Sequence, residues 1–184
     1  MKLDTHLRYI GDPVLRRKSR AIEKPDAKWV RKFSEELLKE MNFHKAGSLS
    51  APQIGQLYRM VALDPHMITH QCDKSEGFNH GILINPKIIS SSEHIKSRWE
   101  SSVSAPGYEF LIERPSGIRV EFQTLDGSKE NHLMVGLLAL VVQQQIDCLD
   151  GLTFVDKIDK SNPRLRFVGL TLPVNRPQQY SPSA

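Results

Sequence analysis

Three side chains near the end of an apolar segment have the spacing of a metal-binding helix. In residues 143–151 (QQQIDCLDG), positions 144 and 148 lie one turn apart, so on a helix they share a face. Two histidines at this spacing can bind one metal ion, with a glutamate beside the first acting as general base. This chain has Gln144, Gln145 and Cys148 at the three positions. The sequence therefore predicts the geometry of a metal-binding helix without its usual ligands.

Two earlier segments extend this pattern. AGSLSAPQIG spans residues 46–55 and ESSVSAPG spans residues 100–107. In order and approximate spacing, the three segments resemble the motifs GxGLAAxQ, EGCLS and QHExDHLxG of the peptide deformylases. Matches at GDPVLR, ILINP and ERP extend the resemblance over residues 7–156. The resemblance implies an α+β fold and a metallohydrolase ancestry, in which Fe²⁺, Zn²⁺ or Ni²⁺ helps to remove the formyl group from the N-terminal methionine of new chains.

The resemblance places unusual residues at the family's catalytic positions. The metal-binding cysteine corresponds to Ser102, and the two metal-binding histidines correspond to Gln144 and Cys148. The catalytic glutamate corresponds to Gln145. Gln53 is retained, and in the family this glutamine helps to bind the carbonyl oxygen as it becomes an oxyanion. The substrate-binding positions that the resemblance implies are Ser48, Leu49 and Val103.

These residue types do not supply the chemistry of a metallohydrolase. A catalytic ion of this kind is held by thiolate and neutral imidazole groups that leave one position for water. A serine hydroxyl stays protonated near neutral pH, and a glutamine carbonyl is a weak ligand for zinc or iron. The amide of Gln145 cannot accept a proton as a general base does. We therefore expect no metal cofactor at Ser102, Gln144 and Cys148.

Three functions are compatible with this pattern. We favour a catalytically inactive deformylase-like protein that keeps a cleft for peptide N-termini or a protein partner, because strand addition relies mainly on backbone hydrogen bonds. The second is a hydrolase with residual or altered activity on N-formylmethionyl peptides, in which Cys148 would need an activating base that its motif lacks. The third is a structural subunit of a translation-associated assembly. The chain ends in proline-containing sequence instead of a basic helix, which disfavours ribosome docking by that route.

Two helices have to position these residues. After Pro25, Asp26 as N-cap and apolar residues at helical spacing predict a first helix that Gly47 closes. Residues 132–148 predict a second helix, which Gly151 ends. Apolar residues on more than one side predict that this second helix is central and buried, and it carries QQQIDCLDG.

Short strands complete the predicted fold. They are expected at 59–63, at 81–89 with an interruption at Pro86, within 95–105, and at 110–112 and 118–124 with a hairpin turn at 126–127. Together with the helices they predict one α+β domain over residues 1–184, in which short strands surround the central helix. Residues 173–184 are rich in Pro and Ser and predict a mobile tail.

Length and composition exclude several classes of protein. The 184 residues, 39% of them hydrophobic, suffice for a core, and no apolar run approaches the roughly 20 residues that cross a bilayer. The formal charge is +4, and residues 1–45 carry 12 Lys and Arg against 7 Asp and Glu. No zinc-finger, KH or RRM signature accompanies this excess, so specific DNA binding is not expected. Cys72 and Cys148 suit a reducing compartment, and we expect a cytoplasmic protein without membrane association.

Histidines before residue 81 raise the question of a second metal site. His66 and His70 have i,i+4 spacing, and His80 follows. Pro65 and Gly77 place them in a loop without a recognised ligand pattern. We therefore predict exposed loop histidines at these positions.

Overall fold

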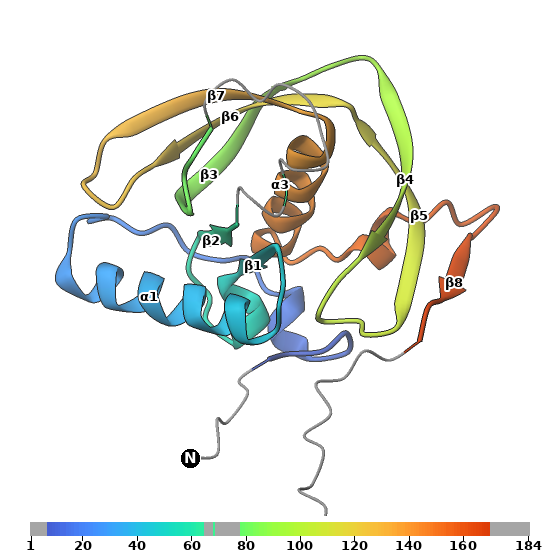
Figure 1. Ribbon diagram of the computed structural model, residues 1–184, viewed down its shortest axis with the longest axis horizontal. Helices are drawn as coiled ribbons and strands as arrows, with labels where there is room; N and C mark the ends of the chain where they lie inside the picture. The colour runs from blue at the N-terminus through green and yellow to red at the C-terminus, as the bar shows by residue number, and fades with distance from the viewer. Residues whose placement is uncertain (1–6, 65–67, 69–77, 170–184) are drawn as a thin grey trace, which may run out of the picture.

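The computed structural model describes residues 7–64, 68 and 78–169, which form two antiparallel sheets around a helix (Figure 1). The larger sheet has the strand order β1-β2-β3-β6-β7, and the smaller has the order β4-β5-β8. The strands of the larger sheet are β1 (Ser48–Ser50), β2 (Met60–Leu63), β3 (Ile82–Ser91), β6 (Gly117–Gln123) and β7 (Lys129–Val135). Those of the smaller sheet are β4 (Ile95–Ser101), β5 (Tyr108–Pro115) and β8 (Leu165–Phe167). The predicted α+β class is confirmed.

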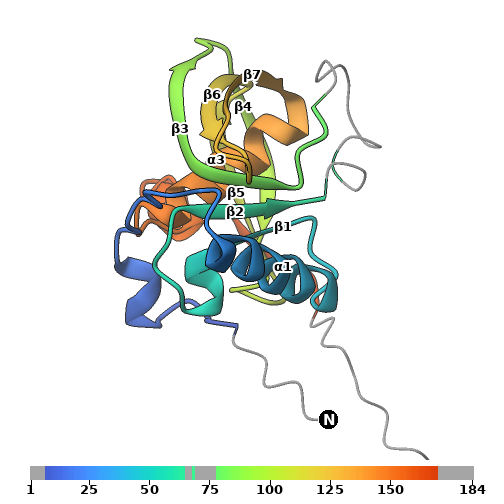
Figure 2. The ribbon, with the colours of Figure 1, turned by 90° about the vertical axis from the view of Figure 1, so that its left-hand side faces the viewer.

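Two helices pack on opposite sides of β2, as the two views in Figure 1 and Figure 2 show. Helix α1 (Lys28–Phe43) buries Val30, Phe33, Leu37 and Met41, the apolar positions that predicted it. It shares a core cluster with Met60 and Ala62 of β2. Helix α3 (Gly136–Leu149) shares the other core cluster with Val61 and Leu63, the alternate residues of the same strand. All four residues of β2 are buried, because each face of this strand meets one of the helices.

The predicted start of the central helix at residue 132 is wrong. Residues 132–135 belong to β7, and α3 begins at Gly136, whose φ of +61° separates strand from helix. Leu133 is 55% exposed and pairs with Arg119 of β6. The apolar residues of this stretch therefore follow the two-residue period of a strand, and the pairing with β6 decides their structure.

Two smaller predictions also need correction. Asp26 does not cap α1: the cap position is Ala27, and no side chain bonds to the helix end. Strand β3 continues through Pro86, where its register with β6 shifts, so the predicted interruption is a bulge. Asn85 has a φ of +53° there, and its side chain accepts from the backbone N–H of Ile22 and donates to the carbonyl oxygen of Ile22, both at 2.8 Å.

Other predictions have different outcomes. The hairpin turn at Asp126 and Gly127 is confirmed between β6 and β7. The proposed tail at 173–184 lies outside the described residues, as do His66, His70 and Cys72. Within the described residues, neither helix has the length and apolar character that a membrane span requires.

Gly151, which follows α3, is expected to tolerate substitution by alanine less well than Gly127 does. Its φ is +78°, and a Cβ atom would lie 2.7 Å from the carbonyl oxygen of Arg16. Gly127 has a φ of +88°, but a Cβ there meets nothing within 4 Å. Gly127→Ala should therefore lower the free energy of unfolding by about 1–2 kcal/mol, the penalty of the left-handed conformation alone. Gly151→Ala should lower it by more, and equal effects in urea denaturation would contradict the close contact.

Candidate functional site

A pocket of about 320 Å³, open to solvent, lies beside α3. Its other walls come from the N-terminal arm, from the segments that follow β1 and β4, and from the segment that follows α3. It is lined by Ile10, Leu15, Gln53, Ser102, Ser104, Gln144, Gln145, Cys148, Leu152, Thr153 and Phe154. The structure thus brings together five residues that the sequence analysis singled out from three distant segments. This volume includes solvent at the open mouth of the pocket, so only a small part of it is enclosed by protein atoms.

Gln53 is held by the short 3₁₀-helix Ala51–Ile54, which follows β1. Its side-chain oxygen accepts from the backbone N–H of Ser50 at 3.0 Å and from the Ser50 hydroxyl at 3.1 Å. Its amide nitrogen donates to the hydroxyl oxygens of Ser102 at 3.3 Å and Ser104 at 3.0 Å. Both amide hydrogens already have acceptors, so Gln53 can bind a ligand oxygen only by giving up one of these bonds.

Gln145 projects from α3 into the pocket and is only partly satisfied. Its amide nitrogen donates to the Ser48 hydroxyl at 3.0 Å. Its side-chain oxygen is buried and has no hydrogen-bond partner among the described residues. A buried acceptor without a partner destabilises the empty site by roughly 1–3 kcal/mol, so the geometry favours a ligand that supplies an N–H or O–H donor.

Gln144 and Cys148 occupy one face of α3, as the sequence predicted. The amide nitrogen of Gln144 donates to the carbonyl oxygen of Ser101 at 3.0 Å, which links α3 to the end of β4. Cys148 has a free thiol, and burial raises its pKa to about 11. At neutral pH this side chain is a thiol, which is a poor nucleophile and a poor metal ligand.

The donor set of the pocket does not fit the metal that the family resemblance implies. Such an ion takes thiolate and imidazole ligands. The pocket offers the Ser102 hydroxyl, the Gln144 amide and the Cys148 thiol, none of which is charged or an imidazole. The Ser102 hydroxyl is also bound to Gln53 and to the backbone N–H of Ser104. No step of a reaction is therefore assigned to a metal here.

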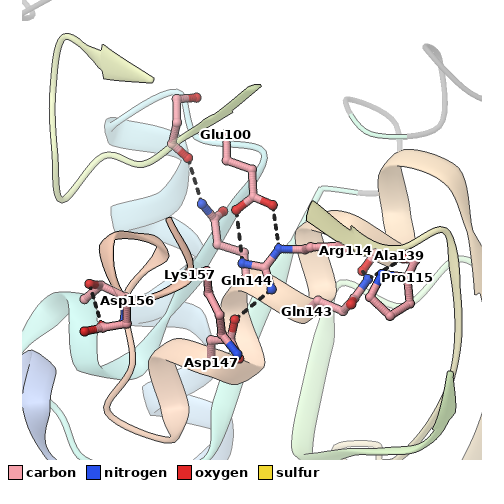
Figure 3. Close-up of polar contacts among 11 residues, drawn as sticks. Glu100, Arg114, Pro115, Ala139, Gln143, Gln144, Asp147, Asp156 and Lys157 are labelled. Atoms are coloured by element: carbon pink, nitrogen blue, oxygen red, sulfur yellow. Dashed lines mark hydrogen bonds and ion pairs between the residues drawn. The ribbon is translucent and has the colours of Figure 1, made fainter. Parts of the chain in front are cut away.

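An ion-pair network lies beside the pocket and joins α3 to the smaller sheet (Figure 3). Arg114 of β5 bonds to both carboxylate oxygens of Glu100, at 2.5 and 3.1 Å, and to Asp147 of α3 at 2.7 Å. Lys157 lies 3.4 Å from the other oxygen of Asp147. The side chain of Arg114 is only 5% exposed, and burial raises the pKa of Glu100 while Arg114 opposes that rise. This network ties α3 to strands β4 and β5 of the smaller sheet.

The structure places the three expected substrate-binding residues around the pocket instead of on its lining. Ser48 accepts a hydrogen bond from Gln145, which lines the pocket. Leu49 is fully buried in the core beneath α1, and Val103 packs against the same cluster. The lining residues that the sequence analysis missed are Ile10, Leu15, Leu152, Thr153 and Phe154. They come from the N-terminal arm and from the stretch after Gly151. The family resemblance of these two segments indicated the fold, but it did not indicate that they contact the pocket.

Cys148 is expected to resist alkylation in the folded protein. A pKa of about 11 against the ordinary 9.0 lowers the thiolate fraction near neutral pH about a hundredfold. Iodoacetamide should therefore modify Cys148 at least about a hundred times more slowly in the folded chain than in the chain unfolded in urea. Peptide mapping by mass spectrometry measures the two rates separately from that of Cys72. Equal rates at Cys148 would contradict the raised pKa, and a faster rate in the folded chain would show an activated thiolate.

Comparisons with known proteins agree with this fold. The model of the polypeptide deformylase family matches residues 5–164. The chain is 34% identical over 151 residues to a peptide deformylase of Dictyoglomus thermophilum, covering 82% of this chain and 90% of that protein. It is similar to the crystal structure of peptide deformylase from Ehrlichia chaffeensis in complex with actinonin, with a TM-score of 0.76, 26% identity and coverage of 84% and 88%.

A second structure gives the same result. The crystal structure of peptide deformylase from Thermotoga maritima matches with a TM-score of 0.73 and 27% identity, covering 83% of this chain and 96% of that one. The fold is the peptide deformylase fold. The chain belongs to the polypeptide deformylase family.

Proposed function

We propose that this member of the deformylase family binds a peptide terminus or a protein segment in its pocket without hydrolysing it. The unpaired oxygen of Gln145 is the observation that carries the proposal. This buried acceptor belongs to a residue that lines the pocket, and the described residues supply no donor for it. The N–H groups of a peptide are such donors.

The strands beside the pocket suit an extended ligand. β1 and β4 are edge strands of their sheets, so each has one side without a strand partner in the described structure. Both contact the glutamines of α3, through the Ser48 hydroxyl and the Ser101 carbonyl oxygen. A peptide can add to such an edge mainly through backbone hydrogen bonds, which tolerate changes of side chain.

The absence of hydrolysis follows from the same residues. Gln145 has no proton-accepting group, and Cys148 remains protonated near neutral pH. Gln53 has both amide hydrogens engaged by serine hydroxyls. A residual hydrolase would need at least one of these three groups to change its state. The hydrogen bond with Ser50 lowers the pKa of Cys148, but burial raises it by more.

Titration calorimetry with short peptides tests the proposal. A formyl-methionyl peptide and the same peptide with a free N-terminus should bind, and no formate should be released from the first. Gln145→Leu removes the unpaired acceptor and should weaken binding of the preferred peptide roughly tenfold. Gln56→Leu, at an exposed position, is the matched control and should leave binding unchanged. Release of formate at the rate of an efficient enzyme, or equal binding by Gln145→Leu and the natural chain, would contradict the proposal.

A further inference from the structure

We propose that His80, Glu130 and His132 form a binding site for a divalent transition-metal ion such as Zn²⁺ at the edge of the larger sheet. One ligand atom from each of the three side chains lies within 4.8 Å of the other two. The site shares no residue with the pocket at α3. The inference is therefore independent of the proposed peptide binding.

The strand period and the sheet register bring the three residues together. Glu130 and His132 are two positions apart on β7, so their side chains share a face, on which the next residue, Met134, is fully buried. They pair with Phe122 and Val120 of β6, respectively. The Glu130 carboxylate lies 3.2 Å from Nε2 of His132. His80 comes from the segment immediately before β3 and completes the group.

Aromatic packing holds the two imidazoles in place. The ring of His132 stacks on Phe122 with centroids 5.7 Å apart, and the ring of His80 meets Phe122 edge-on at 5.2 Å. The two imidazoles are 5.3 Å apart, and Phe78 contacts both of them. His80 is half-buried, so the prediction of an exposed loop histidine is wrong at this position. Rings fixed in this way lose little freedom when they bind an ion, which favours affinity.

Two imidazoles and one carboxylate are a recognised donor set for zinc, with the fourth position left to water. Bonds of about 2.0–2.1 Å at tetrahedral angles place ligand atoms roughly 3.4 Å apart. The contact between Glu130 and His132 is already close to this length. A side-chain rotation that moves a ring nitrogen of His80 by about an ångström completes the set. His132 is the sole ion-pair partner of Glu130 among the described residues, so no lysine or arginine neutralises the carboxylate. Imidazole ligands favour zinc, copper or nickel over magnesium or calcium.

Metal titration of the full chain tests this site. After treatment with a chelator, the protein should bind one equivalent of Zn²⁺ by calorimetry near neutral pH, and bound Co²⁺ should show visible ligand-field absorption. His80→Ala, His132→Ala and Glu130→Gln should each weaken binding by at least about tenfold. His94→Ala, at an exposed histidine, is the matched control, and Cys148→Ala removes the one thiol of the pocket. Both should bind as the natural chain does.

The melting temperature gives a second measurement that also detects misfolded variants. Zn²⁺ should raise the melting temperature of the natural chain and of His94→Ala, because the ion binds only the folded state. Glu130→Gln keeps a polar side chain of the same size, so it should melt like the natural chain without metal and gain little from Zn²⁺. Unchanged metal affinity in His80→Ala and His132→Ala, loss of binding in Cys148→Ala, or no metal binding by the natural chain would overturn the proposal.

Discussion

A variant that combines Ser102→Cys, Gln144→His, Gln145→Glu and Cys148→His is expected to bind a metal ion and to release formate from a formyl-methionyl peptide. The natural chain is expected to bind no ion in the pocket at α3, whatever it binds at His80, Glu130 and His132, and to release no formate. The four substitutions return the residue types that the family resemblance implies, a thiolate, two imidazoles and a carboxylate. Their positions already meet at one pocket, so the backbone needs no new arrangement.

The size of the effect can be divided between the metal and the general base. A variant with the three ligand substitutions but with Gln145 retained should bind metal and remain slow. General acid–base catalysis typically contributes about 10²–10⁴-fold, so adding Gln145→Glu should raise the rate of formate release by that factor. Gln145→Glu alone should have no activity, because no ion activates water beside it. Metal analysis and a formate assay on the four proteins measure both effects.

Two outcomes would contradict this explanation. Formate release by the natural chain at the rate of an efficient enzyme would show that hydroxyl, amide and thiol groups suffice. A folded fourfold variant that binds no more metal than the natural chain would show that the pocket has changed beyond these four side chains. Ala46 and Ser48, at the positions of two family glycines, are the first residues to restore in that case.

Arg114→Met is expected to lower the free energy of unfolding by about 3–5 kcal/mol. Removing one partner of a buried ion pair leaves the other charge without compensation. Here both Glu100 and Asp147 would lose their bonds to Arg114 (Figure 3). The side chain of Glu100 is only 8% exposed. The substitution should also loosen α3 from the smaller sheet and weaken peptide binding. Urea denaturation measures the first effect and calorimetry the second.

Arg166→Met is the matched control in the same sheet. Arg166 pairs with Glu109, but its side chain is 51% exposed, so its removal should lower the free energy of unfolding by about 1 kcal/mol or less. Adding Glu100→Gln and Asp147→Asn to Arg114→Met removes the uncompensated charges and should recover part of the lost stability. If the triple variant is no more stable than Arg114→Met, lost packing and not buried charge explains the effect.

The pH dependence of Arg114→Met follows from Glu100. Burial already raises the pKa of Glu100 above its ordinary 4.5, and the loss of Arg114 removes the main influence that opposes this rise. A carboxyl group whose pKa is higher in the folded state than in the unfolded state favours folding at low pH, and that contribution is lost as the pH rises through these values. The difference in stability between Arg114→Met and the natural chain should therefore be smaller near pH 4.5 than at neutral pH.

Features that depend on local pattern could be predicted from the sequence alone. The apolar positions of α1 recur at helical spacing, and Gly151 takes the left-handed conformation that ends α3. The order of three motifs predicted the family and the α+β class, and six residues of the motif segments line one pocket. Each of these signals lies within a few residues of chain or follows from motif order, so no long-range contact is needed to detect it.

Features that depend on partners distant in sequence became visible in the folded structure. Residues 132–135 are apolar enough for a helix, but hydrogen bonds to β6 make them a strand. The same pairing places His132 beside His80. His80, which the sequence predicted as an exposed loop histidine, is therefore part of a cluster. The amide hydrogens of Gln53 are engaged by serines about fifty residues away. Such contacts form between segments that the chain brings together only on folding, so no local pattern in the sequence records them.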